Sequence, residues 1–400
     1  MAKETSPKSW VGISLFLLVI ASTAGAETTS LDANYVATSL VINPNDIFIT
    51  NGYDVNIGTG GITIKAGGIL DANSGVGGDS LIRLEGDWSN SGLFAAGSST
   101  LDFDGAGSQI ITPGASEPNY TFNNITISGP DVTLAGFVQL SGNFVFEKTT
   151  STFSTGGHDV NVAGDWNNNG IFNHDGGTVT FNGPGPQIII TGGTDPNKTF
   201  NNVRVLGGDV QLTIFGQTLA GNFAFESGGS FSTNGQDVNV AGNLTINSGT
   251  LDANDSNISV GGNWTNNGTF DAGTSTVTLT GDSNSTIGGT NATTFHYLKL
   301  EKADGNNRLS IITDGCGSSN KTWVDSGTLD FSNADVTFTC VNDIEFSGGG
   351  LSSGLKLDVA DMLVLQGDFA FRSASSEDIT GGTIRIAGSL SVEPGADFTP

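Results

Sequence analysis

The chain has 400 residues, of which 59 are glycine and only 14% are charged, and its formal net charge is −26. This composition excludes a disordered chain, because 24 Phe residues and repeated Val, Ile and Leu provide apolar surface to bury. It disfavours helices, since glycine and β-branched residues are frequent, and it disfavours nucleic acid as a partner, since phosphate binding needs a basic stripe. We therefore expect an all-β protein that does not bind nucleic acid.

The N-terminus predicts export. Two lysines precede an apolar run over residues 10–21, and the small residues 24–26 follow it. This pattern is typical of a signal peptide, here over residues 1–26 with cleavage near Ala26-Glu27. No later run approaches the roughly 20 apolar residues that a membrane helix requires. We expect a secreted or cell-surface protein that is not an integral membrane protein, with an N-terminal cap or first coil over residues 27–47.

Residues 48–301 contain a long internal repeat. The segment GDWNNNGIFNHDGGTVTFNG begins at Gly164, and near-copies begin at Gly86 and Gly262. Other segments recur with the same offset as the first two copies, for example Thr-Phe-Asn-Asn at Thr121 and again at Thr199. Each copy carries a tryptophan and, further along, a phenylalanine, namely Trp88, Trp166 and Trp264 with Phe94, Phe172 and Phe270.

The copies differ by one whole unit. Residues 242–261 form an extra piece that the first two copies lack, and the flanking patterns stay in register. A solenoid tolerates such an insertion, because each coil contacts only its neighbours. Segment starts of the form Gly-x-aromatic or Gly-x-Leu recur at the spacing of this extra piece. We therefore expect a parallel β-helix, or β-solenoid, with coils of about 20–22 residues and roughly 17 coils. A tandem of β-sandwiches is the structural alternative.

Beyond residue 301 the repeat weakens, although the strand and corner rhythm persists from Ser326. We expect residues 302–400 to continue the solenoid in degenerate form. Residues 388–400 resemble the opening of another coil, and a stack that ends on an open coil leaves strand edges uncovered. We therefore expect a C-terminus that is incomplete and lacks a cap or an anchor.

The repeated tryptophans could stack on sugars at the surface or fill the interior. Phe144, Phe223 and Leu244 occupy the tryptophan position in other coils, which favours an inward aromatic stack. The repeated phenylalanines are expected in the same interior.

No constellation typical of catalysis stands out. Three acidic pairs would suit glycosidase carboxylates or calcium ligands, but they recur at predicted corners, where aspartate stabilises turns. The pairs are Asp102/Asp104, Asp252/Asp255 and Asp358/Asp361. His158 and His174 are replaced in the other copies, so neither belongs to the repeated design. We predict no catalytic residue and no cofactor, with calcium at the surface as the open alternative.

Asparagine and cysteine each allow two interpretations. Asn-x-Ser/Thr triplets, such as those at Asn124, Asn243 and Asn263, would suit glycosylation, but we favour asparagine ladders hydrogen-bonded from coil to coil. Cys316 and Cys340 are separated by a little over one coil, which places them on adjacent turns. Stacked positions have Cα separations close to those of a disulfide. We predict a bridge, with two free thiols as the alternative.

The repeat combines GDW-x-N-x-G-x-F, G-T-V-T-F-x-G, Q-x-I and T-F-N-N over roughly residues 48–300. In this it resembles repeats of large bacterial exported β-solenoid proteins, the group that includes filamentous haemagglutinin-like and autotransporter-passenger adhesins. The resemblance implies a bacterial, secreted or cell-surface protein without enzymatic activity that acts as an adhesin or a structural stalk. Its partners would be host or neighbouring cell surfaces, matrix or glycans.

Two alternatives remain at this point. One is a polysaccharide-active β-helix enzyme, a lyase or glycoside hydrolase, with an acidic groove of non-repeating residues around Asp304 to Asp343. The other is a structural component of a surface layer or matrix.

Overall fold

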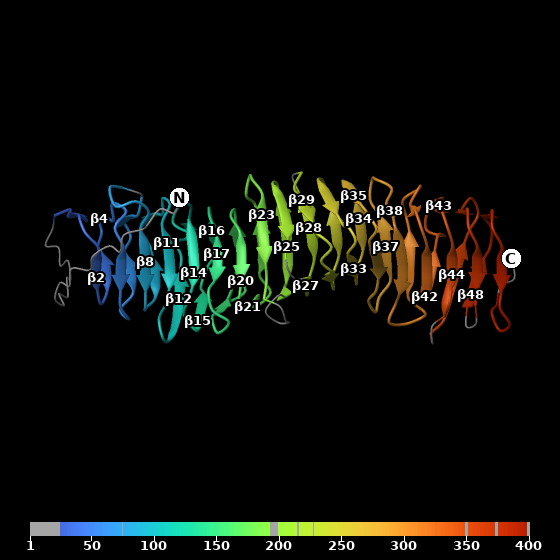
Figure 1. The fold of residues 1–400 in the computed structure, drawn as a ribbon, viewed down its shortest axis with the longest axis horizontal. Coiled ribbons are helices and arrows are strands. Elements are labelled where there is room, and N and C mark those ends of the chain that lie inside the picture. The colour runs from blue at the N-terminus through green and yellow to red at the C-terminus, as the bar shows by residue number, and fades with distance from the viewer. Residues whose placement is uncertain are drawn as a thin grey trace, which may run out of the picture.

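Short parallel strands and tight turns follow one another along the described chain and stack into a rod (Figure 1). The computed structural model describes residues 25–73, 75–192, 199–213, 216–226, 228–348, 351–372 and 375–397. The predicted signal peptide falls almost wholly on residues 1–24, outside the described residues. The rod has about 16 turns, so a strand spacing of ~4.8 Å gives a length on the order of 75 Å. The predicted all-β parallel solenoid is confirmed.

Each coil contributes one strand to each of three columns, and every pairing between the described strands is parallel. Column 1 contains β1 (Thr28–Ser30), β4 (Ile47–Ile49), β7 (Ile69–Asp71), β10 (Leu93–Ala95), β13 (Thr121–Phe122), β16 (Val138–Leu140), β19 (Val160–Val162), β22 (Thr178–Phe181), β25 (Asn202–Leu206), β28 (Phe223–Glu226), β31 (Leu244–Ile246), β34 (Trp264–Asn266), β37 (Ser285–Gly288), β40 (Arg308–Ile311), the second half of β42 (Thr322–Asp330), β45 (Ser353–Leu357) and β48 (Ser375–Ile379).

Column 2 contains β2 (Tyr35–Ala37), β5 (Val55–Ile57), β8 (Leu81–Leu84), β11 (Thr100–Phe103), β14 (Asn124–Ile127), β17 (Phe144–Phe146), β20 (Trp166–Asn168), β23 (Gln187–Ile190), β26 (Asp209–Leu212), β29 (Ser230–Ser232), β32 (Thr250–Asp252), β35 (Thr269–Asp271), β38 (Thr294–Phe295), β41 (Gly317–Ser318), β43 (Thr337–Cys340), β46 (Met362–Leu365) and β49 (Thr383–Ile386).

Column 3 contains β3 (Leu40–Ile42), β6 (Ile62–Ile64), β9 (Trp88–Asn90), β12 (Ser108–Thr112), β15 (Asp131–Leu134), β18 (Thr152–Ser154), β21 (Ile171–Asn173), β24 (Thr199–Phe200), β27 (Gln217–Leu219), β30 (Val238–Val240), β33 (Asn257–Val260), β36 (Thr276–Leu279), β39 (Tyr297–Glu301), the first half of β42, β44 (Ile344–Phe346), β47 (Phe369–Phe371) and β50 (Leu390–Val392). The long strand β42 thus serves two columns, because it runs through a corner without a break.

The period-2 pattern sends alternate side chains into the rod. In β17, Phe144 and Phe146 are buried while Val145 between them is partly exposed, and most of the short strands have the same pattern or its inverse. Turn residues with positive φ, such as Asn254 (49°) and Gly249 (92°), allow the chain to bend at the corners. The interior is therefore one continuous apolar core along the rod.

The inserted segment is one complete coil. Residues 242–261 contain β31, β32 and β33, one strand for each column. Each of these pairs with the corresponding strand of the coil before and the coil after, for example β31 with β28 and β34. The addition therefore lengthened the stack without changing its register.

The two end regions belong to the same stack. Residues 28–42 supply β1, β2 and β3, which form the first coil, and residues 308–392 supply β40 to β50 in the same three columns. The repeat weakens in sequence over the second of these regions, but the strand pairing stays parallel to the last described strand.

Candidate binding surface

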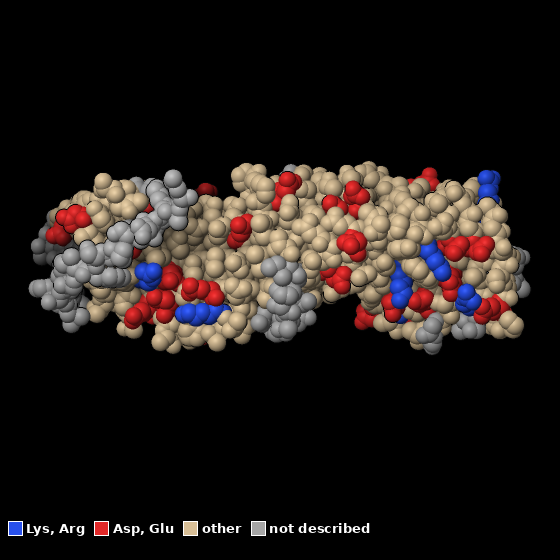
Figure 2. All heavy atoms as spheres, viewed as in Figure 1, with Lys and Arg blue, Asp and Glu red and all other residues tan. Residues whose placement is uncertain are grey.

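Charge is distributed unevenly along the outside of the rod. Figure 2 shows mixed positive and negative charge near β8 to β15 and again near β42 to β48, with only scattered acidic residues on this side in between. Between residues 84 and 298, only Lys148, Lys198 and Arg204 are basic. The middle of the rod is therefore an acidic and otherwise neutral polar surface.

The repeated tryptophans lie inside and form three similar aromatic triads. Trp166 contacts Phe172 and Phe200 at ring-centroid distances of 4.9 and 5.2 Å, and the two Phe rings are 5.5 Å apart. Trp88, Phe94 and Phe122 are separated by 4.8, 5.6 and 5.7 Å, and Trp264, Phe270 and Phe295 by 4.8, 5.2 and 5.7 Å. All three indoles are fully buried, and Phe270 is the one partly exposed member. The indoles therefore fill the core and are closed to ligands.

The three triads do not stack on one another, because each tryptophan lies in a different column. Trp88 is in β9 of column 3, Trp166 in β20 of column 2 and Trp264 in β34 of column 1. Trp166 lies eleven strands after Trp88, and Trp264 lies fourteen strands after Trp166, so each offset is one strand short of a whole number of three-stranded coils. Successive copies of the repeat are therefore turned by one face around the rod.

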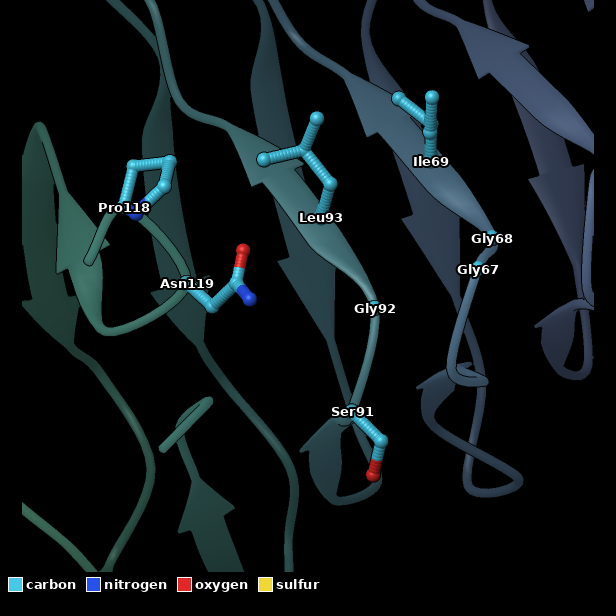
Figure 3. A pocket seen from close by; sticks show the side chains of 8 residues that line it. All are labelled: Gly67, Gly68, Ile69, Ser91, Gly92, Leu93, Pro118 and Asn119. Carbon is cyan, nitrogen blue, oxygen red and sulfur yellow. The ribbon is translucent and has the colours of Figure 1, made fainter. Parts of the chain in front are cut away.

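Each column is interrupted once among the described strands, next to one triad. No strand pairing joins β10 to β13, β21 to β24 or β35 to β38. The first interruption is a shallow pocket of about 380 Å³, between Leu93 on β10 and Pro118 and Asn119 in the loop before β13 (Figure 3). The backbone oxygen of Asn119 accepts a hydrogen bond from Asn90 Nδ2 (2.9 Å). The triads bridge these gaps from the inside.

Asparagine and aspartate form ladders between coils, one at the corner that leads into column 2 and one at the corner that leads into column 1. Asn124 Oδ1 accepts from the backbone N–H of Asn143, and Asn143 Oδ1 accepts from that of Asp165, both at 2.8 Å. A second ladder joins Asn202, Asn222, Asn243, Asn263 and Thr286 in the same way, at 2.8–2.9 Å. The side-chain oxygens of Asn124, Asn243 and Asn263 are thus all used in coil-to-coil bonds.

A buried glutamine secures a corner in the first two copies. Gln187 Oε1 accepts from the Gly183 N–H (2.8 Å), and its Nε2 donates to the carbonyls of Val162 and Gly164 in the preceding coil (2.9 and 2.6 Å). Gln109 makes the equivalent bonds in the first copy. In the third copy the position is Ser285, which is too short to make these contacts, and Lys302 of the next coil reaches into the space.

The acidic pairs lie apart from one another and bond to nearby turn or strand groups. Asp252 Oδ1 accepts from the Asn254 N–H (3.1 Å), and the two oxygens of Asp361 accept from the backbone N–H groups of Asp358 and Val336 (2.7 and 3.4 Å). Asp102 lies 3.8 Å from the Arg83 guanidinium, and burial raises the pKa of its carboxyl. The described residues contain no group of three or more His, Cys, Asp or Glu arranged to hold a metal ion.

The three histidines lie on different turns. His174 Nδ1 accepts from the Gly176 N–H (3.1 Å), and the backbone N–H of His158 donates to the Thr155 carbonyl (3.0 Å). The ring of His296 lies within 3.3–3.4 Å of Ser319 and Asn320 on the next coil. The structure brings none of them to an acidic pair.

The strand register contradicts the predicted disulfide between Cys316 and Cys340. Both cysteines are buried and free. They do lie on adjacent coils, but the partner of Cys340 across the strands is Ser318, so Cys316 is displaced by two residues. Two residues along a strand and one strand spacing correspond to about 8 Å between Cα atoms, beyond the reach of a disulfide. Cys340 Sγ instead contacts Ser318 Oγ (3.1 Å), and Cys316 Sγ accepts from the Thr293 N–H (3.3 Å).

Sequence reasoning missed one surface feature, the fourth tryptophan of the described chain. Trp323 on β42 points outward and contacts Tyr297 on β39, at a centroid distance of 5.3 Å. Trp323 lies beyond the repeat, and Tyr297 takes the position that Asn124 and Asn202 hold in the two earlier copies. The alternation of inward and outward side chains along the strand could have predicted the outward position, since Trp323 lies between Thr322 and Val324, which are both buried.

Comparisons with known proteins identify no relative. No protein-family model, no curated protein and no solved structure matches this chain. Among the described residues, no helix is long and apolar enough to cross a membrane.

Proposed function

We propose that this protein is a non-enzymatic rod, secreted or displayed on a bacterial cell surface, which acts as an adhesin or as the stalk that spaces adhesive regions. The observation that carries the proposal is the rotation of the repeat. Equivalent copies face three sides of the rod, so the surfaces that they carry point around the axis instead of lining one groove. That arrangement suits a rod that is contacted from several sides.

The outward residues support many weak contacts. In column 3 the outward row runs through Thr218, Asn239, Ser259 and Thr278, with one such residue on each coil. Hydroxyl and amide groups repeated at the coil spacing offer hydrogen bonds to an extended polar partner. Individually weak bonds gain strength when several form along one molecule.

The competing enzymatic proposal needs free carboxylates around Asp304 to Asp343. Several carboxylates there are engaged: Asp304 Oδ1 accepts from Asn306, Asp314 Oδ1 from the Thr337 N–H and Asp343 Oδ1 from the Asp368 N–H, all at 2.8–2.9 Å. Asp325 and Asp330 are paired with Lys299 and Arg308. These contacts favour structural use over the paired, cleft-spanning carboxyls of a glycosidase.

Export and surface location rest on the sequence. The leader pattern over residues 1–26 and the resemblance to haemagglutinin-like and autotransporter-passenger repeats support them. A role in a surface layer or matrix is compatible with the same rotation, because a rod with three similar sides can contact neighbours in three directions.

The test is an attachment assay with the exported chain. Beads coated with the protein are applied to cultured cells, matrix and immobilised glycans, while polysaccharide solutions are assayed for new reducing ends and unsaturated products. Attachment without depolymerisation is the expected result. Depolymerisation that a single substitution such as Asp325→Asn abolishes would replace this proposal with the enzymatic one. A rod that attaches to nothing would retain only the stalk role.

A further inference from the structure

Tyr297 and Trp323 lie on the outside of the rod, unlike the three tryptophans of the repeat. Trp88, Trp166 and Trp264 are fully buried, whereas Trp323 points away from the core and is partly exposed. Its ring plane is tilted by 35° from that of Tyr297. The two rings come from successive coils, so they form one partly exposed apolar strip across the sheet.

The strip lies where the outward row of column 3 changes from neutral polar residues to charged and aromatic ones. The neutral row that ends with Thr278 continues with Lys299, then Trp323, then Glu345. The rings are therefore bordered by hydroxyl groups towards the N-terminus and by charged groups on the following coils. This is the part of the rod where Figure 2 shows charges of both signs close together.

The charged neighbours hold one another in place. Lys299 Nζ lies 3.0 Å from Asp325. Lys321 Nζ donates to Glu345 (2.7 Å) and lies over the Trp323 ring, 5.2 Å from its centre. Arg372 also donates to Glu345, at 2.6 Å. The bonds to Lys321 and Arg372 hold the pKa of Glu345 below its usual range, against the effect of burial. These side chains thus form an ordered set of donors and acceptors beside the rings.

The patch is electrically balanced although the protein is strongly acidic. The cations Lys299, Lys321 and Arg372 are balanced by Glu301, Asp325 and Glu345, with which they are paired, in a chain whose net charge is −26. An ionic ligand would find no net attraction here, and a polyanion would be repelled by the rest of the rod. A ligand with apolar faces and a neutral polar rim suits the patch best.

We propose that Tyr297 and Trp323, with Lys299, Lys321, Asp325 and Glu345, form a binding subsite for a neutral sugar ring of an oligosaccharide or polysaccharide. A pyranose presents C–H groups on its face and hydroxyls around its edge, so the face lies on the aromatic rings and the edge bonds to the charged side chains. Aromatic rings supply apolar contact area, and the ordered polar groups fix the orientation. The subsite would give the proposed adhesive rod a glycan partner, and in that respect it rests on the proposed function.

The experiment uses the exported chain and immobilised neutral polysaccharides, namely glucan, galactan, mannan and chitin, with alginate and hyaluronate as acidic comparators. Affinity electrophoresis and changes in tryptophan fluorescence measure binding. We expect retention on at least one neutral polysaccharide, weakened roughly tenfold or more by Trp323→Ala and by Tyr297→Ala, with partial recovery in Trp323→Phe. Far-UV circular dichroism establishes that each variant keeps the fold.

A matched control exists on the same rod. Tyr120 and Phe137 form another partly exposed aromatic pair, 4.9 Å apart, so Tyr120→Ala should leave binding unchanged. Failure of the wild-type chain to bind any neutral polysaccharide overturns the subsite, as does equal binding by folded Trp323→Ala. Attachment to cells by a wild-type chain that binds no neutral polysaccharide would reject the subsite but keep the adhesive rod, with a protein partner as its target. Polysaccharide binding without cell attachment would keep the subsite and reject the adhesive role of the rod.

Discussion

Lys302 Nζ donates to Ser285 Oγ (2.8 Å) at the corner where the two earlier copies of the repeat carry a glutamine. The same ammonium group donates to the carbonyl of Thr280 (2.5 Å), and the residue is 1% exposed. A lysine of the following coil thus occupies this corner, although it donates to a carbonyl that differs from those the glutamines contact. The replacement brings a titratable group into the core.

This burial predicts a pH-dependent stability. Desolvation lowers the pKa of Lys302 to about 8, while Asp282 acts in the opposite direction. Between about pH 8 and 10.5 the unfolded chain binds the proton and the folded chain does not, so Lys302 adds stability as pH rises through this window and loses it as pH falls towards 8. The gain is on the order of 2 kcal/mol.

Urea unfolding of the wild type and of Lys302→Met at pH 7.5 and 10 measures this effect. The effect is read from the difference in unfolding free energy between the two proteins at each pH. This difference is needed because burial raises the pKa of both cysteines, so their titration lowers the stability of both proteins as pH rises. The prediction fails if that difference is the same at both pH values.

Removal of one coil should leave the fold intact. Deleting residues 242–261 takes out β31, β32 and β33 together, so β34, β35 and β36 can pair with β28, β29 and β30 in the same columns. We expect unchanged circular dichroism per residue and cooperative unfolding. Deletion of residues 252–261 is the matched control, since it removes only part of a coil and should disrupt the core. Equal stability of the two deletions would contradict the coil assignment.

The inserted coil and the inward tryptophans could be predicted from the sequence, because both depend on local pattern. The rotation of the repeat is harder to see, although its signal is present: the offset from Trp88 to Trp166 is not a whole number of coils of the expected length. Counting strands per repeat would have placed these two tryptophans on different faces. The third ring of each triad, such as Phe122, follows a loop whose path periodicity does not determine.

The cysteine error has a local cause. The offset from Cys316 to Cys340 is close to one average coil, but the coil that ends at Cys340 begins at Ser318, because these two residues are partners across the strands. A displacement of two residues is enough to separate the sulfur atoms. The proposed subsite at Tyr297 and Trp323 was missed for a related reason, since it lies at the end of the repeat and is assembled from three coils.

Substitution of an interior tryptophan should be far more costly than substitution of the outward one. Trp166 contacts five phenylalanine rings and is fully buried, so Trp166→Ala should reduce the free energy of unfolding by about 3–5 kcal/mol. Trp323→Ala should cost about 1 kcal/mol or less. Guanidinium unfolding followed by circular dichroism compares them. Similar losses for both would indicate that Trp323 is a core residue and not a surface platform.

The thiols of Cys316 and Cys340 should be free but protected. Burial raises the pKa of both, which disfavours the reactive thiolate. We expect no alkylation by iodoacetamide in the folded protein at pH 8, and two alkylated cysteines after denaturation without a reductant, as read by mass spectrometry. Detection of a linked peptide containing both cysteines would restore the disulfide.

The corner ladder can be tested at Asn143, whose Oδ1 accepts the Asp165 N–H and whose N–H donates to Asn124 Oδ1. Asn143→Ala removes one acceptor and should cost roughly 0.5–1.5 kcal/mol of unfolding free energy, because the Asp165 N–H loses its partner within the rod. Asn143→Asp should retain most of the stability, since Asp165 itself accepts from the Ile188 N–H at the next rung (2.8 Å). Hydrogen exchange at the Asp165 amide gives a direct readout, with faster exchange expected only in the alanine variant. If the Asp165 amide exchanges as fast in the aspartate variant as in the alanine variant, the Oδ1 acceptor is not what protects this amide. The asparagine side chain would then stabilise the corner by packing instead of by hydrogen bonding.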